Sequence, residues 1–315
     1  MNAVQPSAPL VSVVVVAYRN RDTIGACLDS VAAQSGVACE VLVVDNSPDL
    51  GTWAALREAR RAHPDRDVSA LRPERNLGFA GGCNLGARHA RGRYLLFLNP
   101  DAALEPGALA TLLGFWEKTP GAGLLGPRIL DECGRTMRTC RALPSLLGTF
   151  LDATGLDNRL GYYKLVRFPH NETRRVPQVM GACMFTTREL YERFQGLDER
   201  FFVYFEEVDL CKRMADAGLA VWFVAGAAAS HQAGTSCESE HSAAAMVAQL
   251  RKSRALYFRK HFSTPAWLAL LTLNWLEGVG KALACALLYA VRGRRRDLEK
   301  AKGFWRVALC PACSR

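Results

Sequence analysis

The sequence has no internal repeat and no low-complexity tract, and only 22% of its 315 residues are charged while half are hydrophobic. This composition excludes a disordered chain and a protein with many membrane spans. The length is sufficient for one large or two ordinary domains with a substantial core. No signal peptide is expected, because the first apolar run, residues 10–17, follows no basic leader and is too short to span a bilayer.

The eleven cysteines show no pairing pattern. Several of them, such as Cys27, Cys183 and Cys211, lie inside apolar runs, where cysteine behaves as a small hydrophobic residue. This usage is typical of reduced thiols in the cytosol. Cys310 and Cys313 form a lone Cys-x-x-Cys pair without a second pair, which argues against a zinc site.

The net charge of +10 predicts an anionic partner, such as a nucleic acid, a phosphorylated substrate or a membrane surface. Four arginines cluster at residues 292–296, directly after a long apolar stretch. That position favours a basic patch on an anionic membrane over a stripe that follows a nucleic acid. We therefore expect no nucleic-acid partner.

Apolar, β-branched runs alternate with amphipathic helical patterns over residues 10–121. Strands are expected at 10–17, 39–45, 68–71 and 93–98, and helices at 23–34, 52–62, 79–90 and 106–118. Such alternation predicts βαβ units and a mostly parallel, doubly wound sheet of the nucleotide-binding α/β class. Residues 1–9 are expected to form a flexible tail.

Residues 122–262 have a different rhythm and predict a mixed half built around the ends of the same sheet. Strands are expected at 179–186 and 220–224, and a helix at 241–261, which Pro265 ends. Between residues 143 and 177 the sequence shows no clear period.

Residues 263–315 are apolar and then basic, and we expect this segment to associate with a membrane. Its apolar part, 266–291, is long enough to span a bilayer, but Asn274, Glu277 and Lys281 fall on one helical face. This polar stripe predicts a helix that lies in the membrane interface, with the protein peripheral on the inner face of the cell membrane. A spanning helix and a helix that packs against the domain are the alternatives.

Polar residues follow the first two expected strands, where ligands bind in α/β sheets. Ala17, Tyr18 and Asn20 end the first strand, and Asp45 ends the second. A carboxylate at the second position can accept hydrogen bonds from a nucleoside, although a capping or turn Asp is equally compatible with the sequence.

A glycine-rich segment, residues 76–86, follows the third expected strand. Glycines at a helix start let a ligand approach the backbone, where free N–H groups bind phosphate. The segment is not a dinucleotide fingerprint, because it does not follow the first strand and lacks the Gly-x-Gly-x-x-Gly spacing. A purely structural helix start is the alternative.

The fourth expected strand ends in Asn99-Pro100-Asp101. Oxygen ligands at this spacing can hold a hard cation such as Mg2+ or Mn2+, which in turn bridges phosphates. An ordinary strand-end turn is the alternative.

Three carboxylates, Glu206, Glu207 and Asp209, directly follow an aromatic run at residues 201–205. Glu206 and Asp209 lie one turn apart at the start of an expected helix, where the helix dipole favours negative charge. Because removing carboxylates from water costs several kcal/mol, such residues need a partner or a task. An acidic first turn that only stabilises the helix is the alternative.

Together these motifs resemble glycosyltransferase family 2, whose members are inverting transferases with a single α/β nucleotide-sugar domain of the GT-A type. The resemblance covers about residues 10–262 and is carried by residues 11–20, 44–47, 76–84, 98–101, 180–184 and 201–210. Within the family the chain is most similar to bacterial rhamnosyltransferases and related enzymes of O-antigen, capsule or cell-wall glycan assembly.

The resemblance implies that Asp45 contacts the donor nucleoside and that Asn99-Pro100-Asp101 stands at the DxD motif of the family, with Asn in place of the first Asp. Asp101 would then hold Mg2+ or Mn2+, weakly. Glu206-Glu207 stands at the ED motif, with Glu in place of Asp, so that Glu207 is the expected base. His231 begins a His-x-x-Gly-x-Ser element, residues 231–236, and would approach the metal, with a structural histidine at the end of a strand as the alternative.

The same resemblance gives Asp209 a supporting role and places Glu206, Gly181 and Ala182 near the acceptor. The other implied donor contacts are Ala17, Tyr18, Asn20, Asn76, Gly78, Gly81, Asn84 and Asn99.

The implied reaction is inverting transfer of a sugar, with rhamnose favoured, from a nucleotide-diphosphate donor. dTDP-rhamnose is the favoured donor and a UDP-sugar the other candidate, and the acceptor is a saccharide or polyprenyl-linked saccharide of a bacterial surface polysaccharide. Two alternatives stay open: an inactive, membrane-attached scaffold of the same fold, and a sugar-nucleotide nucleotidyltransferase. The latter needs a glycine- and lysine/arginine-rich phosphate loop directly after the first strand, where this chain has residues 18–22, Tyr-Arg-Asn-Arg-Asp.

Overall fold

The computed structural model describes residues 10–62, 64, 66–232 and 243–309. The tail expected at residues 1–9 and the Cys310 and Cys313 pair lie outside the described residues. Contacts divide the described chain into two units, each treated separately below. The sheet unit comprises residues 10–143, 167–202 and 206–232, and the helical unit comprises residues 144–166, 203–205 and 243–309.

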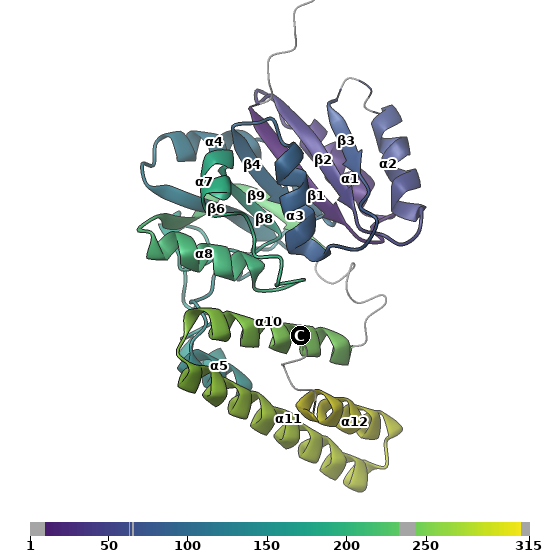
Figure 1. Cartoon of the computed structure of the whole chain (residues 1–315), viewed down its shortest axis with the longest axis vertical. Coiled ribbons are helices and arrows are strands. Elements are labelled where there is room, and N and C mark those ends of the chain that lie inside the picture. The colour runs from purple at the N-terminus through teal and green to yellow at the C-terminus, as the bar shows by residue number, and fades with distance from the viewer. Residues whose placement is uncertain (1–9, 63, 65, 233–242, 310–315) are drawn as a thin grey trace, which may run out of the picture. The chain divides into compact units, whose positions relative to one another are not determined.

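The sheet unit contains one sheet, whose described strands follow the order β3-β2-β1-β4-β8-β6-β9-β5, with β7 pairing with β9 (Figure 1). The strands are β1 (Val11–Ala17), β2 (Cys39–Asp45), β3 (Val68–Leu71), β4 (Tyr94–Leu98), β5 (Ala102–Leu104), β6 (Ala122–Leu130), β7 (Arg174–Arg175), β8 (Cys183–Thr187) and β9 (Ala220–His231). β1 to β4 are parallel to one another, as the sequence predicts, whereas β8 is antiparallel to β4 and β5 is antiparallel to β9.

Helices cover both faces of this sheet, because the apolar β1 buries side chains in both directions. They are α1 (Ile24–Ala32), α2 (Gly51–Ala62), α3 (Gly78–His89), α4 (Ala108–Glu117), α7 (Arg188–Arg193) and α8 (Glu206–Asp216). Val13 and Val15 of β1 share one core with α1 and α4. Val14 and Val16 point to the other face, against α3. The predicted α/β fold class is confirmed.

Some element boundaries differ from those expected. β8 begins at Cys183 rather than at residue 179, and β9 continues to His231 rather than ending at residue 224. The segment without a clear period contains two short helices, α5 (Leu146–Ala153) and α6 (Asp157–Leu160). Short helices show few turns of periodicity, so that their pattern is easily missed.

The helical unit contains α5, α6, α10 (Ala243–His261), α11 (Thr264–Arg292) and α12 (Arg295–Leu309). Pro265 lies in the first turn of α11, where its missing N–H costs no helical hydrogen bond. Within this unit α10 contacts both α11 and α12. The assignment of residues 10–262 to one catalytic domain and of 263–315 to a membrane-associating segment stays a prediction.

The polar stripe expected on α11 faces α10. Asn274 is buried in the same row as Leu270, Gly278 and Ala282. The Glu277 carboxylate lies 2.9 Å from the Arg251 guanidinium of α10. Asn274 and Glu277 of the stripe therefore pack against a neighbouring helix, whereas the Lys281 side chain is 47% exposed and pairs with Glu277.

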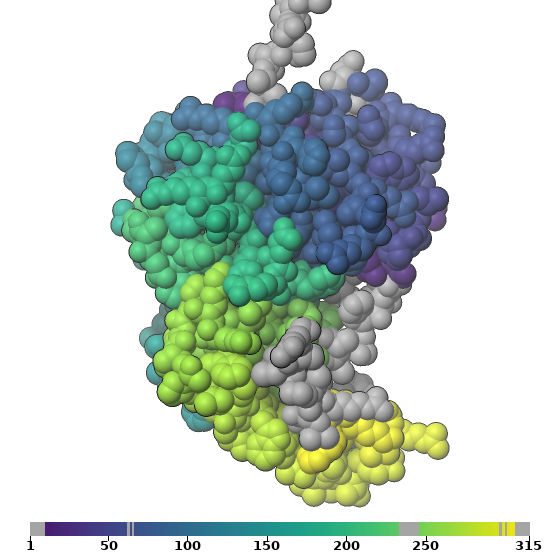
Figure 2. All heavy atoms as spheres, viewed as in Figure 1, coloured from purple at the N-terminus to yellow at the C-terminus, as the bar shows by residue number. Residues whose placement is uncertain are grey.

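The opposite face of α11 is apolar and open to solvent. Leu276, Leu283 and Leu287 are 53%, 62% and 67% exposed. Side chains of this part of the chain, yellow-green in Figure 2, form an open surface of the helical unit. α11 is long and apolar enough to cross a membrane, but length and composition alone are weak evidence of a span, because core helices of soluble proteins pass the same test.

Candidate active site

The carboxyl ends of β1, β2 and β4 meet at one edge of the sheet, because the three parallel strands are neighbours in register. Ala17 is paired with Asp45 at this edge. The Asp45 side chain is fully buried, and its Oδ1 accepts the N–H of Ser47 at 3.0 Å. Its Oδ2 is buried with no hydrogen-bond partner in the described structure. A buried acceptor without a donor is costly, so this oxygen is suited to a ligand N–H or hydroxyl group.

The loop after β1 is shaped by its own polar groups. The Asn20 side chain accepts the N–H of Tyr18 at 2.8 Å, and the N–H of Arg19 donates to Ser47 Oγ at 2.8 Å. Arg19 has a φ of 56°, which an arginine adopts only where the surroundings hold it. The Asn20 amide thus holds the loop, while the Tyr18 ring remains partly exposed beside the Arg19 guanidinium.

The glycines of α3 serve close packing. A Cβ at Gly82 would lie 2.6 Å from a Val16 methyl group, and one at Gly86 would lie 2.4 Å from a Val14 methyl group. Such distances are shorter than real Cβ contacts, so only glycine lets α3 approach β1 this closely. The structural alternative considered for this segment accounts for both glycines.

The start of α3 is saturated by protein acceptors. Its N–H groups at Leu77, Gly78 and Phe79 donate to Asn46 Oδ1, Asn76 Oδ1 and the carbonyl oxygen of Phe202. Gly78 has a φ of +73°, and a Cβ there would lie 2.3 Å from the Phe202 carbonyl oxygen. At Gly81 a Cβ would meet Leu77 at 2.9 Å. These three N–H groups thus have protein acceptors in the described structure, and the donor contacts expected of Asn76, Gly78 and Gly81 stay predictions.

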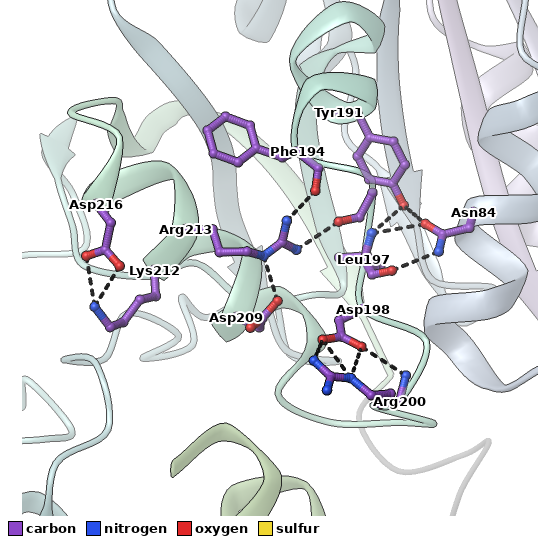
Figure 3. A network of polar contacts seen from close by, with 11 residues as sticks. Asn84, Tyr191, Phe194, Leu197, Asp198, Arg200, Asp209, Lys212, Arg213 and Asp216 are labelled. Atoms are coloured by element: carbon purple, nitrogen blue, oxygen red, sulfur yellow. Dashed lines mark hydrogen bonds and ion pairs between the residues drawn. The ribbon is translucent and has the colours of Figure 1, made fainter. Parts of the chain in front are cut away.

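The Asn84 side chain is hydrogen-bonded to neighbouring residues of the protein (Figure 3). Its Nδ2 donates to the Leu197 carbonyl and to Glu199 Oε1, and its Oδ1 accepts from the Tyr191 hydroxyl and the Leu197 N–H. These four bonds use the whole hydrogen-bonding capacity of an amide. The donor contact expected of Asn84 stays a prediction, and it would have to replace one of these bonds.

A polar cluster forms between the residues that follow β4 and the last residue of β9. The register pairs Ala102 with His231 and so sets the imidazole against Asp101. His231 Nε2 lies 3.2 Å from Asp101 Oδ1 and 3.3 Å from Asn99 Nδ2. His231 Nδ1 is buried without a hydrogen-bond partner in the described structure. The Gly234 and Ser236 of its motif lie outside the described residues.

This cluster fits a divalent cation only in part. A carboxylate oxygen and an imidazole nitrogen are suitable ligands for Mn2+ or Mg2+. Within the described residues, however, no three His, Cys, Asp or Glu side chains are grouped as a ready metal site. A cation here would therefore need oxygens from a bound ligand, which agrees with the weak site expected from Asn99.

The acidic helix α8 begins at a strained turn. Tyr204 and Phe205, directly before it, have φ values of 69° and 73°, which aromatic residues rarely adopt. Glu206 is buried, and burial first and the charge of Glu207 second raise its pKa well above the usual value. This shift favours the protonated form of the Glu206 carboxyl.

Glu207 lies against the loop that precedes β8. A Cβ at Gly181 would lie 3.6 Å from the Glu207 carboxyl carbon, an ordinary van der Waals distance, so this glycine lies directly beside the carboxyl group. The next residue, Ala182, accepts the N–H of Asn99 at 2.9 Å through its carbonyl oxygen. Glu207 of α8 thus lies beside Gly181, and the next residue, Ala182, is hydrogen-bonded to Asn99 of the cluster at the end of β4.

Asp209 has no access to solvent and is ion-paired with Arg213 at 2.7 Å (Figure 3). The same guanidinium donates to the carbonyl oxygens of Phe194 and Gly196. Arg213 thus ties Asp209 of α8 to the backbone of residues 194–196, and the supporting role expected of Asp209 stays a prediction. Arg213 is the residue that the sequence analysis missed, and its signal was the i,i+4 spacing from Asp209.

Comparison with known proteins shows the family of this chain. The family model for "Glycosyl transferase family 2" matches residues 12–194, more than half of the chain. An N-acetylglucosaminyl-diphospho-decaprenol L-rhamnosyltransferase of Mycobacterium tuberculosis is 28% identical over 313 residues, covering 92% of this chain and 97% of that protein.

Two solved structures are similar over most of the chain. The mannosyltransferase PcManGT of Pyrobaculum calidifontis, in complex with GDP-Man and Mn2+, has a TM-score of 0.61 at 18% identity and covers 96% of this chain and 87% of its own. S. aureus TarS 1-349, in complex with UDP-GlcNAc, has a TM-score of 0.55 at 13% identity and covers 95% and 90%. At such identities the likeness shows the fold alone. With the family match, it follows that the chain belongs to glycosyl transferase family 2 and is a glycosyltransferase with the GT-A fold.

Proposed function

We propose that this protein transfers a sugar, with inversion at the anomeric carbon, from a nucleotide-diphosphate donor to a hydroxyl group of a saccharide. The observation that supports this best is the position of Glu207 against Gly181, one residue from the backbone bond between Ala182 and Asn99. It puts one candidate base beside the edge of the sheet where the donor would bind. A single base that removes the acceptor proton during direct displacement leads to inversion.

The donor nucleoside is assigned to the edge formed by β1 and β2. Asp45 Oδ2 is the buried acceptor available to it, and Ala17 and Tyr18 line the same loop. The relative from Mycobacterium tuberculosis is named as an L-rhamnosyltransferase and matches nearly the whole chain, which favours dTDP-rhamnose. A UDP-sugar is the other candidate.

Asp101 and His231 would hold Mg2+ or Mn2+, with Asn99 beside them. When bound, the metal would neutralise negative charge on the diphosphate as it leaves. The residues of the chain would do the rest: Glu207 takes the acceptor proton, Asp209 and Arg213 fix its helix, and the acceptor hydroxyl binds near Gly181, which lies beside Glu207.

The acceptor we favour is a polyprenyl-linked saccharide, because the Mycobacterium tuberculosis relative is named for a decaprenol-linked one. The exposed leucines of α11 form the surface that would bind the cytoplasmic face of the membrane, and Arg292, Arg294 and Arg295 would meet anionic headgroups. Burial of Glu277 against Arg251 favours an interfacial helix over a spanning one, because spanning would expose these charges to lipid.

The test is a donor panel of dTDP-rhamnose, UDP-GlcNAc and GDP-mannose with N-acetylglucosaminyl-diphospho-polyprenol as acceptor. Nucleoside diphosphate release and the mass of the lipid product are measured with Mn2+ and Mg2+. We expect one donor to give a glycosylated lipid and Glu207→Gln to abolish most of it. The exposed Glu58→Gln variant on α2 is the matched control and should keep full activity. Nucleotide binding without transfer from any donor would instead support the inactive scaffold.

A further inference from the structure

Arg128 lies on β6 at the edge of the sheet that carries the candidate site. Phe185 of β8 is paired with Leu96 of β4 and with Leu125 of β6, both in antiparallel register. β4 and β6 therefore run in the same direction and end at the same edge. Three residues beyond these paired positions, Asn99 and Arg128 lie at the same level of the sheet.

The Arg128 side chain lies on the face of the sheet that α8 covers. A Cβ at Gly126 would lie 2.6 Å from Val179, which belongs to the loop that also contacts Glu207. Because side chains alternate along a strand, Arg128 shares the face of Gly126. Ile129 lies on the opposite face, in the core formed with α1 and α4. Arg128 and the candidate base are therefore on the same side of the sheet.

Arg128 has no counter-ion. Its Nε is buried and has no hydrogen-bond partner in the described structure, and no ion pair of Arg128 is found among the described residues. Asp131, the nearest acid along the chain, is paired with Arg135 at 2.9 Å. A partly buried positive charge without a partner is costly, so a protein gains little by keeping one unless an anion binds to it.

A second arginine lies beside the first. The Met137 N–H donates to the Ile129 carbonyl oxygen at 2.8 Å, in antiparallel register with the end of β6. Continuing this register by one residue places Arg138 next to Arg128. Within the part of the chain that the structure describes, Arg138 is not ion-paired either. Two like charges at neighbouring positions repel each other, and an anion bound by both would remove this repulsion.

We propose that Arg128 and Arg138 form a subsite for the diphosphate group of the acceptor. A planar guanidinium binds phosphate oxygens through paired, charge-assisted hydrogen bonds. The proposal rests on the proposed function for the class of acceptor, a saccharide linked to polyprenol through a diphosphate. The acceptor is favoured over the donor because Arg128 shares the face of Glu207, whereas the donor diphosphate is assigned to Asp101 and His231.

The test compares three variants that each remove one positive charge. Arg128→Gln and Arg138→Gln alter the subsite. Arg135→Gln is the matched control, because this arginine lies in the same stretch of chain but is 76% exposed and already paired with Asp131. Each variant is assayed with two acceptors, N-acetylglucosaminyl-diphospho-polyprenol and octyl N-acetylglucosaminide, which carries the same sugar without a diphosphate.

With the diphosphate acceptor, Arg128→Gln should lower kcat/KM about tenfold or more, the usual contribution of hydrogen bonds to a charged group. Arg138→Gln should lower it by a smaller factor, because this side chain is exposed. With the octyl acceptor, both variants should match wild type and Arg135→Gln. Equal losses with both acceptors would overturn the proposal. A raised donor KM would assign the arginines to the donor diphosphate and would overturn it as well.

Calorimetric titration with geranyl diphosphate gives a readout that does not depend on activity. The full-length protein is first saturated with UDP or dTDP, so that the donor site is filled. Wild type and Arg135→Gln should bind the probe equally, and Arg128→Gln about tenfold more weakly. No binding to wild type, or equal binding to Arg128→Gln, refutes the subsite even if the protein is a glycosyltransferase. Binding that depends on Arg128, without transfer to any polyprenyl-linked acceptor, supports the subsite and refutes the proposed function.

Discussion

His231 Nε2 lies 3.2 Å from Asp101 Oδ1, although the two residues are far apart in the sequence. The antiparallel pairing of β5 with β9 is responsible, because it sets His231 opposite Ala102. Both side chains are nearly inaccessible to solvent, and Asn99 reaches the same imidazole nitrogen. The three side chains form a polar cluster at the edge of the sheet where the donor diphosphate is proposed to bind.

Metal dependence is the first prediction. Activity should require Mn2+ or Mg2+ and disappear with a chelator, and Asp101→Ala or His231→Ala should act like metal removal. The exposed His89→Ala variant on α3 is the control for loss of an imidazole. Calorimetric titration of the nucleotide-free protein with MnCl2 should show weak binding that tightens when UDP or dTDP is added. Tight binding without nucleotide would contradict the two-ligand site.

Glu207→Gln should lower kcat about 10²–10⁴-fold, the usual contribution of a general base, while nucleotide affinity hardly changes. Steady-state kinetics and nucleotide titration of the same preparation measure both quantities. Glu206→Gln should be affected less, since burial and the neighbouring charge already raise the pKa of Glu206 and favour its neutral form. A fully active Glu207→Gln variant beside a dead Glu206→Gln variant would exchange their roles.

The raised pKa of Glu206 also predicts how stability depends on pH. A carboxyl whose pKa is higher in the folded chain than in the unfolded chain stabilises the fold fully below its unfolded pKa, and this stabilisation is lost as pH rises through the folded pKa. Glu206→Gln removes the titration. Its melting temperature relative to wild type should therefore increase as pH rises above about 4.5, the ordinary value. Melting curves between acid and neutral pH that run parallel would speak against a buried, protonated Glu206.

Two neighbouring ion pairs on α8 should differ in their contribution to stability (Figure 3). Arg213→Ala removes the ion pair of the fully buried Asp209 and should lower the free energy of unfolding by about 3–5 kcal/mol. Lys212→Ala breaks a pair with Asp216, whose side chain is 59% exposed, and should cost about 0–1 kcal/mol. Denaturant unfolding of both variants is the measurement. Equal effects would mean that the buried pair is not what fixes α8.

The apolar face of α11 should decide membrane binding. Leu276→Glu, Leu283→Glu and Leu287→Glu should each weaken binding to vesicles that contain phosphatidylglycerol, because each puts a charge on the surface that enters the lipid. Leu50→Glu is the matched control, since Leu50 is 61% exposed but lies in the sheet unit. Cosedimentation with vesicles measures the effect.

The mode of attachment is tested on the full-length protein. High salt or alkaline carbonate should partly strip it from membranes, whereas a need for detergent would show that α11 spans the bilayer. Deletion of residues 265–315 is a poorer test than substitution. It would remove Glu277 and Asn274 and leave the buried Arg251 and Arg254 without these partners.

The sequence alone was sufficient for the α/β class, the parallel strands β1 to β4 and the family, because each depends on local patterns. Buried β-branched runs such as β1 specify strands by their own side chains. Asp45 at the end of β2, Asp101 after β4 and Glu207 in the first turn of α8 belong to patterns that are recognisable over a few residues. The length of β9 was not predictable from its own residues, since its continuation to His231 depends on pairing with β5 and β6.

Tertiary structure decided which polar residues are available for ligands. Asn84 and Asp209 resemble site residues in sequence, but neighbours from other segments use their hydrogen-bonding groups. The polar residues of α11 predicted a helix in the membrane interface, and in the structure Glu277 and Asn274 contact Arg251 and Arg254, because buried charges need partners. A sequence determines the character of each side chain, whereas only the packed chain determines which groups remain without a partner.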